Sequence, residues 1–208
     1  MYLSKVELRL SNPGIRAAMR DYQKMHQLVN GFFNVGRKEA EILYRVRARG
    51  NTIDLYLYST VPVDQTRILR DMRLIGQRDV TSWLESMEKG DSFEFQIATA
   101  PFKKVSSGSL KNSQRRSLKT QDERLAWLVR KAEQGGFHII SVDERPAEQL
   151  TVIHQEEKGG KMIMDPYCYT GILQIINADS FRSAMRKGVG PGKAYGLGMI
   201  MLKRVGYV

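Results

Sequence analysis

The sequence predicts an α+β protein made of two similar halves. Stretches that alternate apolar and polar residues, typical of half-buried strands, recur with helical stretches between them in an order that repeats along the chain. With 208 residues, 42% of them hydrophobic, the chain can form one domain or two small ones with a core each. We expect two small domains in tandem; a single mixed α+β domain is the alternative.

The first half reads strand, helix, strand, strand, helix, strand. Its helix begins after Pro13 and ends before Gly31, while Gly50 and Asn51 suit a tight turn between two strands. The expected elements are strands at 2–10, 43–49, 53–60 and 92–98, one helix within 12–30, and helical stretches at 63–74 and 79–88. This order predicts a ferredoxin-like (βαββαβ) domain over residues 1–100.

The second half follows a basic, Ser-rich segment at 101–119, which is interpreted as a linker. Its order resembles that of the first half, with the first strand displaced by an inserted helix. Its first helix has Thr120 as N-cap, Glu123 at the capping-box position, and Gly135 and Gly136 at its end. The expected elements are helices at 120–134 and 179–187 and strands at 137–142, 150–155, 161–176 (bent near Pro166) and 197–205. A second ferredoxin-like domain is therefore predicted over residues 120–208.

Charge indicates the kind of partner. Lysine and arginine outnumber aspartate and glutamate by 33 to 22, and the net charge of +11 favours a polyanion such as nucleic acid. No run approaches 18 apolar residues and the first ten residues do not form a signal peptide, so we expect a cytoplasmic protein without a membrane partner. One cysteine, Cys168, and three scattered histidines predict neither a disulfide nor a metal site, and no cofactor is expected.

The chain ends in a glycine-rich stretch, KGVGPGKAYGLGMIM at 187–201, in which Lys193 is surrounded by glycines 188, 190, 192, 196 and 198. Glycine exposes backbone N–H groups, so such a loop can approach phosphates, with the lysine as a point charge. The spacing is neither that of a Walker A loop, because Ala194 follows the lysine, nor that of a dinucleotide fingerprint, because the order is helix, loop, strand. A turn that merely lets the last strand enter a sheet is the alternative.

The segment KKVSSGSLKNSQRRSLK at 103–119 is the strongest electrostatic feature, since it contains no acidic residue. Its basic residues are Lys103, Lys104, Lys111, Arg115, Arg116 and Lys119. They can follow a phosphate backbone, and their binding would be sensitive to salt. A solvated linker between domains is the alternative, and both interpretations can hold together.

Tyr22 and His26 are the candidates for proton transfer. They lie four residues apart on the predicted first helix, so both side chains project from one face. Histidine titrates near neutral pH and can donate a proton to a leaving oxygen or accept one from an attacking hydroxyl. Packing of this face against the sheet is the alternative for the pair, and His138 and His154, on predicted strands, are expected to be structural.

Several of these segments together resemble one family, the CRISPR RNA-processing endoribonucleases of type I-E systems (the CasE family). They are MYLSKVEL, DYQKMHQLV, APFKK, KTQDERLAWLVRKAEQGGF and GVGPGKAYGLGMIML, which span essentially the whole chain in order. The resemblance implies a protein of two ferredoxin-like domains that cuts the repeats of a long CRISPR transcript beside a hairpin. It also implies that the protein stays with the processed guide and the other subunits of the Cascade surveillance complex.

The resemblance further implies a chemistry. Family members cleave without metal by attack of the RNA 2′-hydroxyl, giving a 2′,3′-cyclic phosphate and a 5′-hydroxyl, a reaction closed to DNA. His26 matches the family's histidine and is expected to act as general acid, with Tyr22 orienting the 2′-hydroxyl. The family pattern places the tyrosine three residues before the histidine, and this chain places it four before. By the same analogy Gly190, Gly192 and Lys193 are expected near the RNA backbone.

Two other functions remain open from the sequence. One is an RNA-hairpin-binding subunit of a ribonucleoprotein complex that has lost catalysis. The other is a general RNA-binding module built from tandem ferredoxin-like domains and unrelated to CRISPR. Cleavage of a cognate repeat RNA in EDTA separates the enzyme from the first, and equal affinity for scrambled hairpins would favour the second.

Overall fold

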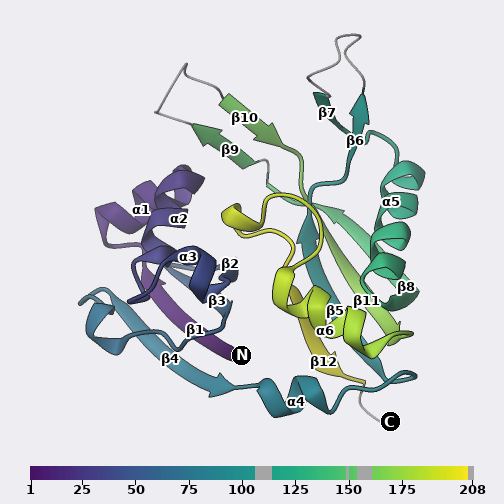
Figure 1. Ribbon diagram of the computed structural model, residues 1–208. Helices are drawn as coiled ribbons and strands as arrows, with labels where there is room; N and C mark the ends of the chain where they lie inside the picture. Colours follow the sequence, from purple (N-terminus) through teal and green to yellow (C-terminus); the bar gives the residue numbers. More distant parts are fainter. Residues whose placement is uncertain (106–113, 149, 154–160, 206–208) are drawn as a thin grey trace.

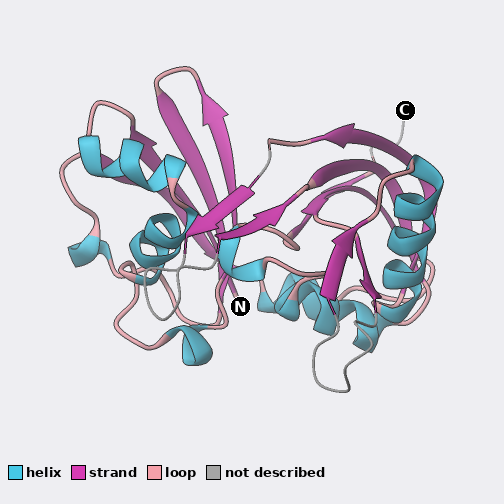
Figure 2. Ribbon diagram, turned by 90° about the horizontal axis from the view of Figure 1, so that it is seen from above, coloured by secondary structure: helices cyan, strands magenta, loops and turns pink. Residues whose placement is uncertain are grey.

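The computed structural model describes residues 1–105, 114–148, 150–153 and 161–205. They form two units that lie side by side, each with a four-stranded antiparallel sheet (Figures 1 and 2). The sheet orders, β2-β3-β1-β4 and β12-β5-β11-β8, both have the first strand of the unit in the centre beside its third and fourth strands. This is the ferredoxin-like arrangement, so the predicted α+β fold is confirmed. Within the described ranges, no helix is long and apolar enough to span a bilayer.

The first unit packs its helices α1 and α2 on one face of its sheet. Its elements are β1 (Tyr2–Arg9), α1 (Pro13–Arg20), α2 (Tyr22–Asn30), α3 (Arg37–Ala40), β2 (Leu43–Arg49), β3 (Thr52–Ser59), η1 (Gln65–Arg67), β4 (Met72–Asp79) and α4 (Thr81–Glu85). Val6 and Leu8 alternate toward this face of β1 and pack in one cluster with Met25 and Val29 of α2. The neighbouring part of the α2 surface is left for other contacts.

The helical stretch predicted within 12–30 is two helices rather than one. Asp21 adopts an extended conformation (φ −133°, ψ 106°) that ends α1, and its carboxylate accepts a 2.9 Å hydrogen bond from the backbone N–H of Gln23. An aspartate at this position is a favourable N-cap. The second helix therefore begins at Tyr22, which stands in its first turn.

The helix predicted over 63–74 is wrong. This stretch contains only the short 3₁₀ helix η1 and the start of the strand β4. Because β4 is at the edge of the sheet and exposes most of its side chains, it lacks the apolar alternation that marks a half-buried strand. The helical piece expected at 79–88 is confirmed as α4.

The second unit uses a strand that the sequence analysis gave to the first. Its elements are β5 (Ser92–Thr99), β6 (Phe102–Val105), β7 (Gln114–Ser117), α5 (Gln121–Gln134), β8 (Phe137–Pro146), β9 (Leu150–Ile153), β10 (Lys161–Met164), β11 (Tyr167–Ile175), α6 (Ala178–Lys187), η2 (Lys193–Tyr195) and β12 (Ile200–Arg204). β5 pairs with β11 and β12, so its assignment to the first half is wrong. Alternation predicts a strand but not its partners. We therefore propose a division between the units within 80–91 instead of at residue 100.

Two further predictions change in detail. The linker at 101–119 contains a two-stranded hairpin, β6–β7. The strand predicted at 161–176 is two strands interrupted at Asp165 and Pro166, in keeping with the missing N–H of proline. Its first part, β10, pairs with β9 instead of joining the main sheet.

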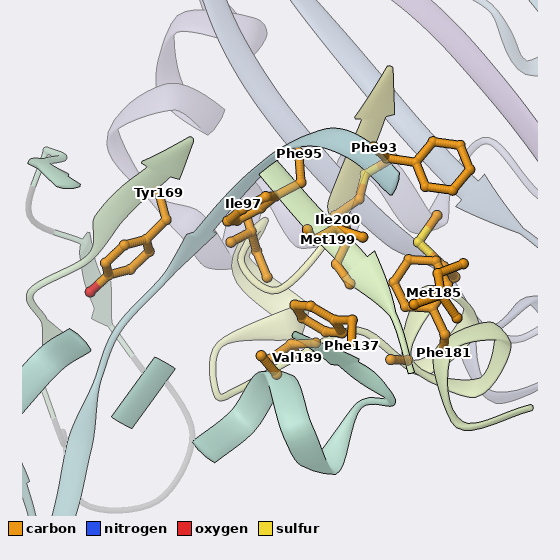
Figure 3. Packing of buried hydrophobic residues seen from close by; sticks show 14 of the residues in the cluster. Phe93, Phe95, Ile97, Phe137, Tyr169, Phe181, Met185, Val189, Met199 and Ile200 are labelled. Atoms are coloured by element: carbon orange, nitrogen blue, oxygen red, sulfur yellow. The ribbon is translucent and has the colours of Figure 1, made fainter. Parts of the chain in front are cut away.

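Apolar packing joins the two units. Phe93, Phe95 and Ile97 of β5 belong to the second core, which also contains Phe137, Phe181 and, from the loop after α6, Val189 (Figure 3). Leu43 and Tyr58 of the first unit are buried in this same cluster. The glycine loop, drawn in yellow, lies between α2 and the second sheet (Figure 1).

Candidate functional site

Tyr22 and His26 share the face of α2 that points to the second unit. The helix buries Met25 and Val29 in the first core, while Tyr22 and His26, on the part of the helix surface beside them, are half-buried. The ring of His26 meets the ring of Tyr195 edge to face, with centroids 6.4 Å apart and planes at 69°. The structure thus brings the predicted pair together with the glycine loop; their catalytic roles stay predictions.

Tyr22 is placed to donate a hydrogen bond rather than to accept a proton. It packs against a small apolar cluster formed by Ala100, Leu150, Met164 and Leu197. Burial raises the pKa of its hydroxyl, and the negative charge of Glu148 raises it further. The phenol therefore remains protonated at neutral pH, which suits a group that orients an attacking or leaving oxygen.

Asn30 is a neighbour of His26 that the sequence analysis missed. Its side-chain Nδ2 lies 3.1 Å from Nε2 of the imidazole, one helical turn along α2. The sequence already contained the information for this contact, because residues four apart on a helix are neighbours. An amide in hydrogen-bond contact restricts the orientation of the imidazole.

The glycine loop is hydrogen-bonded to both units and places Tyr195 against His26. The Tyr44 hydroxyl of the first unit donates a 2.9 Å hydrogen bond to the carbonyl of Ala194. On the second unit, the N–H of Gly198 donates to the carbonyl of Ala98 at 2.7 Å. The loop is therefore a bridge between the units, and the α2 side of this bridge is the candidate catalytic site.

Packing explains why Gly190 and Gly192 are glycines. Both have positive φ, 83° and 77°. A Cβ atom on Gly190 would lie 2.4 Å from Oγ1 of Thr99 and 2.8 Å from the Trp127 ring, and one on Gly192 would lie 2.7 Å from the Leu197 side chain. These contacts favour the alternative from the sequence, a turn that lets the last strand enter its sheet. A direct contact of the two glycines with RNA stays a prediction.

Lys193 belongs to a cluster of positive charges around the loop. Partial burial lowers the pKa of its ammonium group, and the nearby charges of Lys131 and Lys187 lower it further. A groove of 780 Å³ is lined by these lysines together with Arg115. Among the described residues that line this groove, one is acidic: Asp179, which forms an ion pair with Arg182 at 2.8 Å.

A second hollow of 420 Å³ continues this basic surface toward the first unit. Lys187 and Lys193 line both cavities, and Lys38 and Arg186 line the second. Like charges gathered in grooves repel one another and attract a polyanion. The sequence analysis did not single out Lys38, Lys131, Arg186 or Lys187. Lys131 stands in the last turn of α5, and Arg186 and Lys187 stand in the last turn of α6. A basic residue at such a position also interacts favourably with the helix dipole.

The basic segment contributes Arg115 to the lining of the larger groove. In the β6–β7 hairpin Lys104 stands opposite Arg115 and Lys103 opposite Arg116. The guanidinium of Arg115 lies over the Phe102 ring, 5.0 Å from its centroid. Facing cations destabilise a bare hairpin, so the arrangement favours an anionic ligand.

The six basic residues predicted for RNA binding are not equivalent. Lys103 pairs with Glu123 at 3.0 Å, and Lys119 lies 3.8 Å from Asp165. Lys104, Arg115 and Arg116 have no carboxylate within ion-pair distance in the part of the chain that the structure describes. Lys111, like His154, lies outside the described residues.

Fold and site together define a protein of two ferredoxin-like units whose glycine loop joins a histidine-bearing helix to a basic groove. The chain belongs to a family described as "CRISPR associated protein", which matches residues 1–204.

Individual relatives extend along the whole chain. The CRISPR-associated endoribonuclease Cse3 of Thermus thermophilus is 28% identical over 96% of this chain and 98% of its own length. The Cascade subunit CasE of Escherichia coli is 27% identical over 97% and 98%. A solved structure of Cse3 bound to a 19-nucleotide RNA has a TM-score of 0.85 at 22% identity, covering 98% of this chain and all of that one. This likeness supports the fold.

Proposed function

We propose that the protein is a metal-independent endoribonuclease that cleaves CRISPR precursor RNA at repeat hairpins. The observation that carries the proposal is the glycine loop, which presents Tyr195 to His26 on one side and Lys193 to the basic grooves on the other. A group able to transfer protons therefore lies beside a surface suited to a phosphate backbone. The name of the T. thermophilus relative, an endoribonuclease, supports the same activity, and membership of the CRISPR-associated family supports the CRISPR context.

The reaction needs little from the protein beyond placement and a proton. The 2′-hydroxyl next to the scissile phosphate attacks phosphorus, releases its own proton to solvent, and forms the 2′,3′-cyclic phosphate. The 5′-oxygen leaves with a proton from the His26 imidazolium. The protonated phenol of Tyr22 is suited to hold one of the reacting oxygens, and the lysines around the loop offset the charge of the phosphates.

The RNA partner and the assembly follow from the same proposal. The hairpin's phosphates lie along the groove lined by Arg115, Lys131, Lys187 and Lys193. The protein then stays with the guide RNA and the other Cascade subunits, as the name of the E. coli relative indicates for that protein. Such a complex works in the cytoplasm, where we place the chain.

End-mapped cleavage of the host's own repeat RNA tests the activity. Wild-type protein in EDTA is expected to give one cut beside the hairpin with a cyclic phosphate end. His26→Ala is expected to lose about 10²- to 10⁴-fold in single-turnover rate while binding the RNA normally. His138→Ala, which alters an exposed histidine of β8, is the matched control and should cleave like wild type.

The same assay decides between the alternatives. Binding without cleavage by wild-type protein, with or without metal, would indicate a non-catalytic RNA-binding subunit. Cleavage that EDTA stops would indicate a metal nuclease. An unchanged rate for His26→Ala would remove His26 from the mechanism.

A further inference from the structure

Asn30, the last residue of α2, makes a contact with His26 that packing alone does not account for. Its Nδ2 is 3.1 Å from His26 Nε2, and its Oδ1 is buried without a hydrogen-bond partner among the residues described. A buried amide oxygen left unpaired carries a desolvation cost that no hydrogen bond offsets. Such a cost beside a candidate catalytic residue points to a role for this amide that the resting hydrogen bonds do not reveal.

An amide can serve an imidazole in either protonation state. Its NH₂ group donates to an unprotonated ring nitrogen, and its oxygen accepts from a protonated one. Half a turn about the Cβ–Cγ bond places one or the other against Nε2, and the two orientations have nearly the same shape. A carboxylate at this position would only accept, and would thereby favour the charged ring.

We propose that Asn30 is a positioning residue that holds Nε2 of the His26 imidazole and so keeps the ring in one orientation, while the other ring nitrogen, Nδ1, exchanges the proton used in cleavage. The Tyr195 ring, edge to face with the imidazole, limits its movement from the side of the glycine loop. Asn30 acts through His26 in this role. The inference rests on the proposed function, since it assigns Asn30 a part in the proton transfer at His26.

The titratable groups on the elements around His26 are known for the described residues. Tyr22 and Lys24 belong to α2, which has Asp21 as its N-cap, and Tyr195 and Lys193 belong to η2. Arg16 and Arg20 belong to α1, which packs against α2, and Glu148 precedes β9 and acts on Tyr22. All of them are unchanged in variants of residue 30. A changed titration of His26 in such a variant therefore reports on the amide itself.

The test measures the His26 pKa by NMR and the pH dependence of single-turnover cleavage in the same proteins. Asn30→Asp is expected to raise the pKa of His26 by about one unit and to move the corresponding limb of the pH–rate profile by the same amount. Asn30→Leu, similar in size but without hydrogen bonds, is expected to slow cleavage roughly tenfold with unchanged RNA affinity. Gln27→Glu places the same charge at an exposed position of α2 and is the control.

Each possible result supports or overturns a specific part of the proposal. A pKa of His26 that is the same in Asn30→Asp and Gln27→Glu, or wild-type cleavage by Asn30→Leu, would overturn the role of Asn30. If His26→Ala cleaves normally, the role of His26 in the proposed mechanism fails instead, and the NMR titration still shows whether residue 30 controls the imidazole. Asn30→Ala replaces the leucine variant if circular dichroism shows that the latter is unfolded.

Discussion

The Tyr44 hydroxyl donates a 2.9 Å hydrogen bond to the backbone carbonyl of Ala194 and so ties β2 of the first unit to the glycine loop of the second. Tyr44 is only 1% exposed, and its ring also stands 3.0 Å from where a Cβ on Gly196 would lie. The residue after Ala194 is Tyr195, which meets the ring of His26. One buried hydroxyl therefore helps to set the position of the loop against α2, the helix that carries His26.

Tyr44→Phe is expected to lower the free energy of unfolding by about 1 kcal/mol, because the carbonyl of Ala194 loses its donor. Cleavage should slow more than RNA binding weakens, since Tyr195 moves relative to His26. Urea unfolding and single-turnover kinetics measure the two effects. Tyr2→Phe, at a half-buried tyrosine of β1, controls for the loss of a hydroxyl. Equal stability and rate in both variants would show that the hydrogen bond has no such role.

Replacing Arg115 and Arg116 together by alanine is expected to weaken RNA binding and to reduce its dependence on salt. If each arginine neutralises one phosphate, the slope of log K against log salt falls by roughly two units at most. Filter binding of the repeat hairpin at several salt concentrations measures the slope. The matched control is Arg73 and Arg78, both exposed on the edge strand β4, replaced by alanine. An unchanged slope in the Arg115 and Arg116 variant would place the RNA elsewhere.

Local signals in the sequence predicted the elements that depend on local structure. The capping box of Thr120 and Glu123 and the closing Gly135 fixed α5, and the Gly50–Asn51 turn fixed the hairpin of β2 and β3. The largest errors concern β4 and β5, whose partners lie far away along the chain. Alternation predicts that a segment is a strand, whereas the partner of an edge or central strand depends on the folded core.

The candidate site shows the same limit. The spacing of four residues on a helix predicted that Tyr22 and His26 share a face. The same spacing could have predicted that Asn30 is a neighbour of His26. The clustering of Lys131, Lys187 and Lys193 could not, because these residues come from α5, α6 and the glycine loop and meet only when the units fold. The reason for glycine at positions 190 and 192 could be recognised only from the structure, because a Cβ atom at either position would lie too close to a neighbouring side chain.

The lowered pKa of Lys193 predicts a dependence of stability on pH. A lysine whose folded-state pKa is below its unfolded value of 10.5 destabilises the folded state while it is charged. This penalty is fully present below the folded-state pKa and disappears as the pH rises toward 10.5. Lys193→Gln should therefore be more stable than wild type at neutral pH, by a difference that shrinks as the pH approaches 10.5.

Urea unfolding of both proteins between pH 7 and 10.5 measures this difference, and Lys89→Gln, at an exposed lysine, controls for general loss of charge. RNA should reverse the order at neutral pH, because bound phosphates stabilise the charged form of Lys193. A stability difference that does not vary with pH would show that the neighbours of Lys193 do not disfavour its charge.

Gly190→Ala separates the structural role of the glycine from a role in RNA contact. The new Cβ would lie 2.4 Å from Thr99 Oγ1 and 2.8 Å from the Trp127 ring, at a φ of 83° that alanine rarely adopts. We expect the free energy of unfolding to fall by roughly 2–3 kcal/mol through overpacking and backbone strain. Gly76→Ala, where a Cβ meets nothing within 4 Å and φ is not positive, should change it far less. If Gly190→Ala instead keeps its stability and loses only RNA affinity, this glycine serves the RNA backbone directly and packing is not its reason.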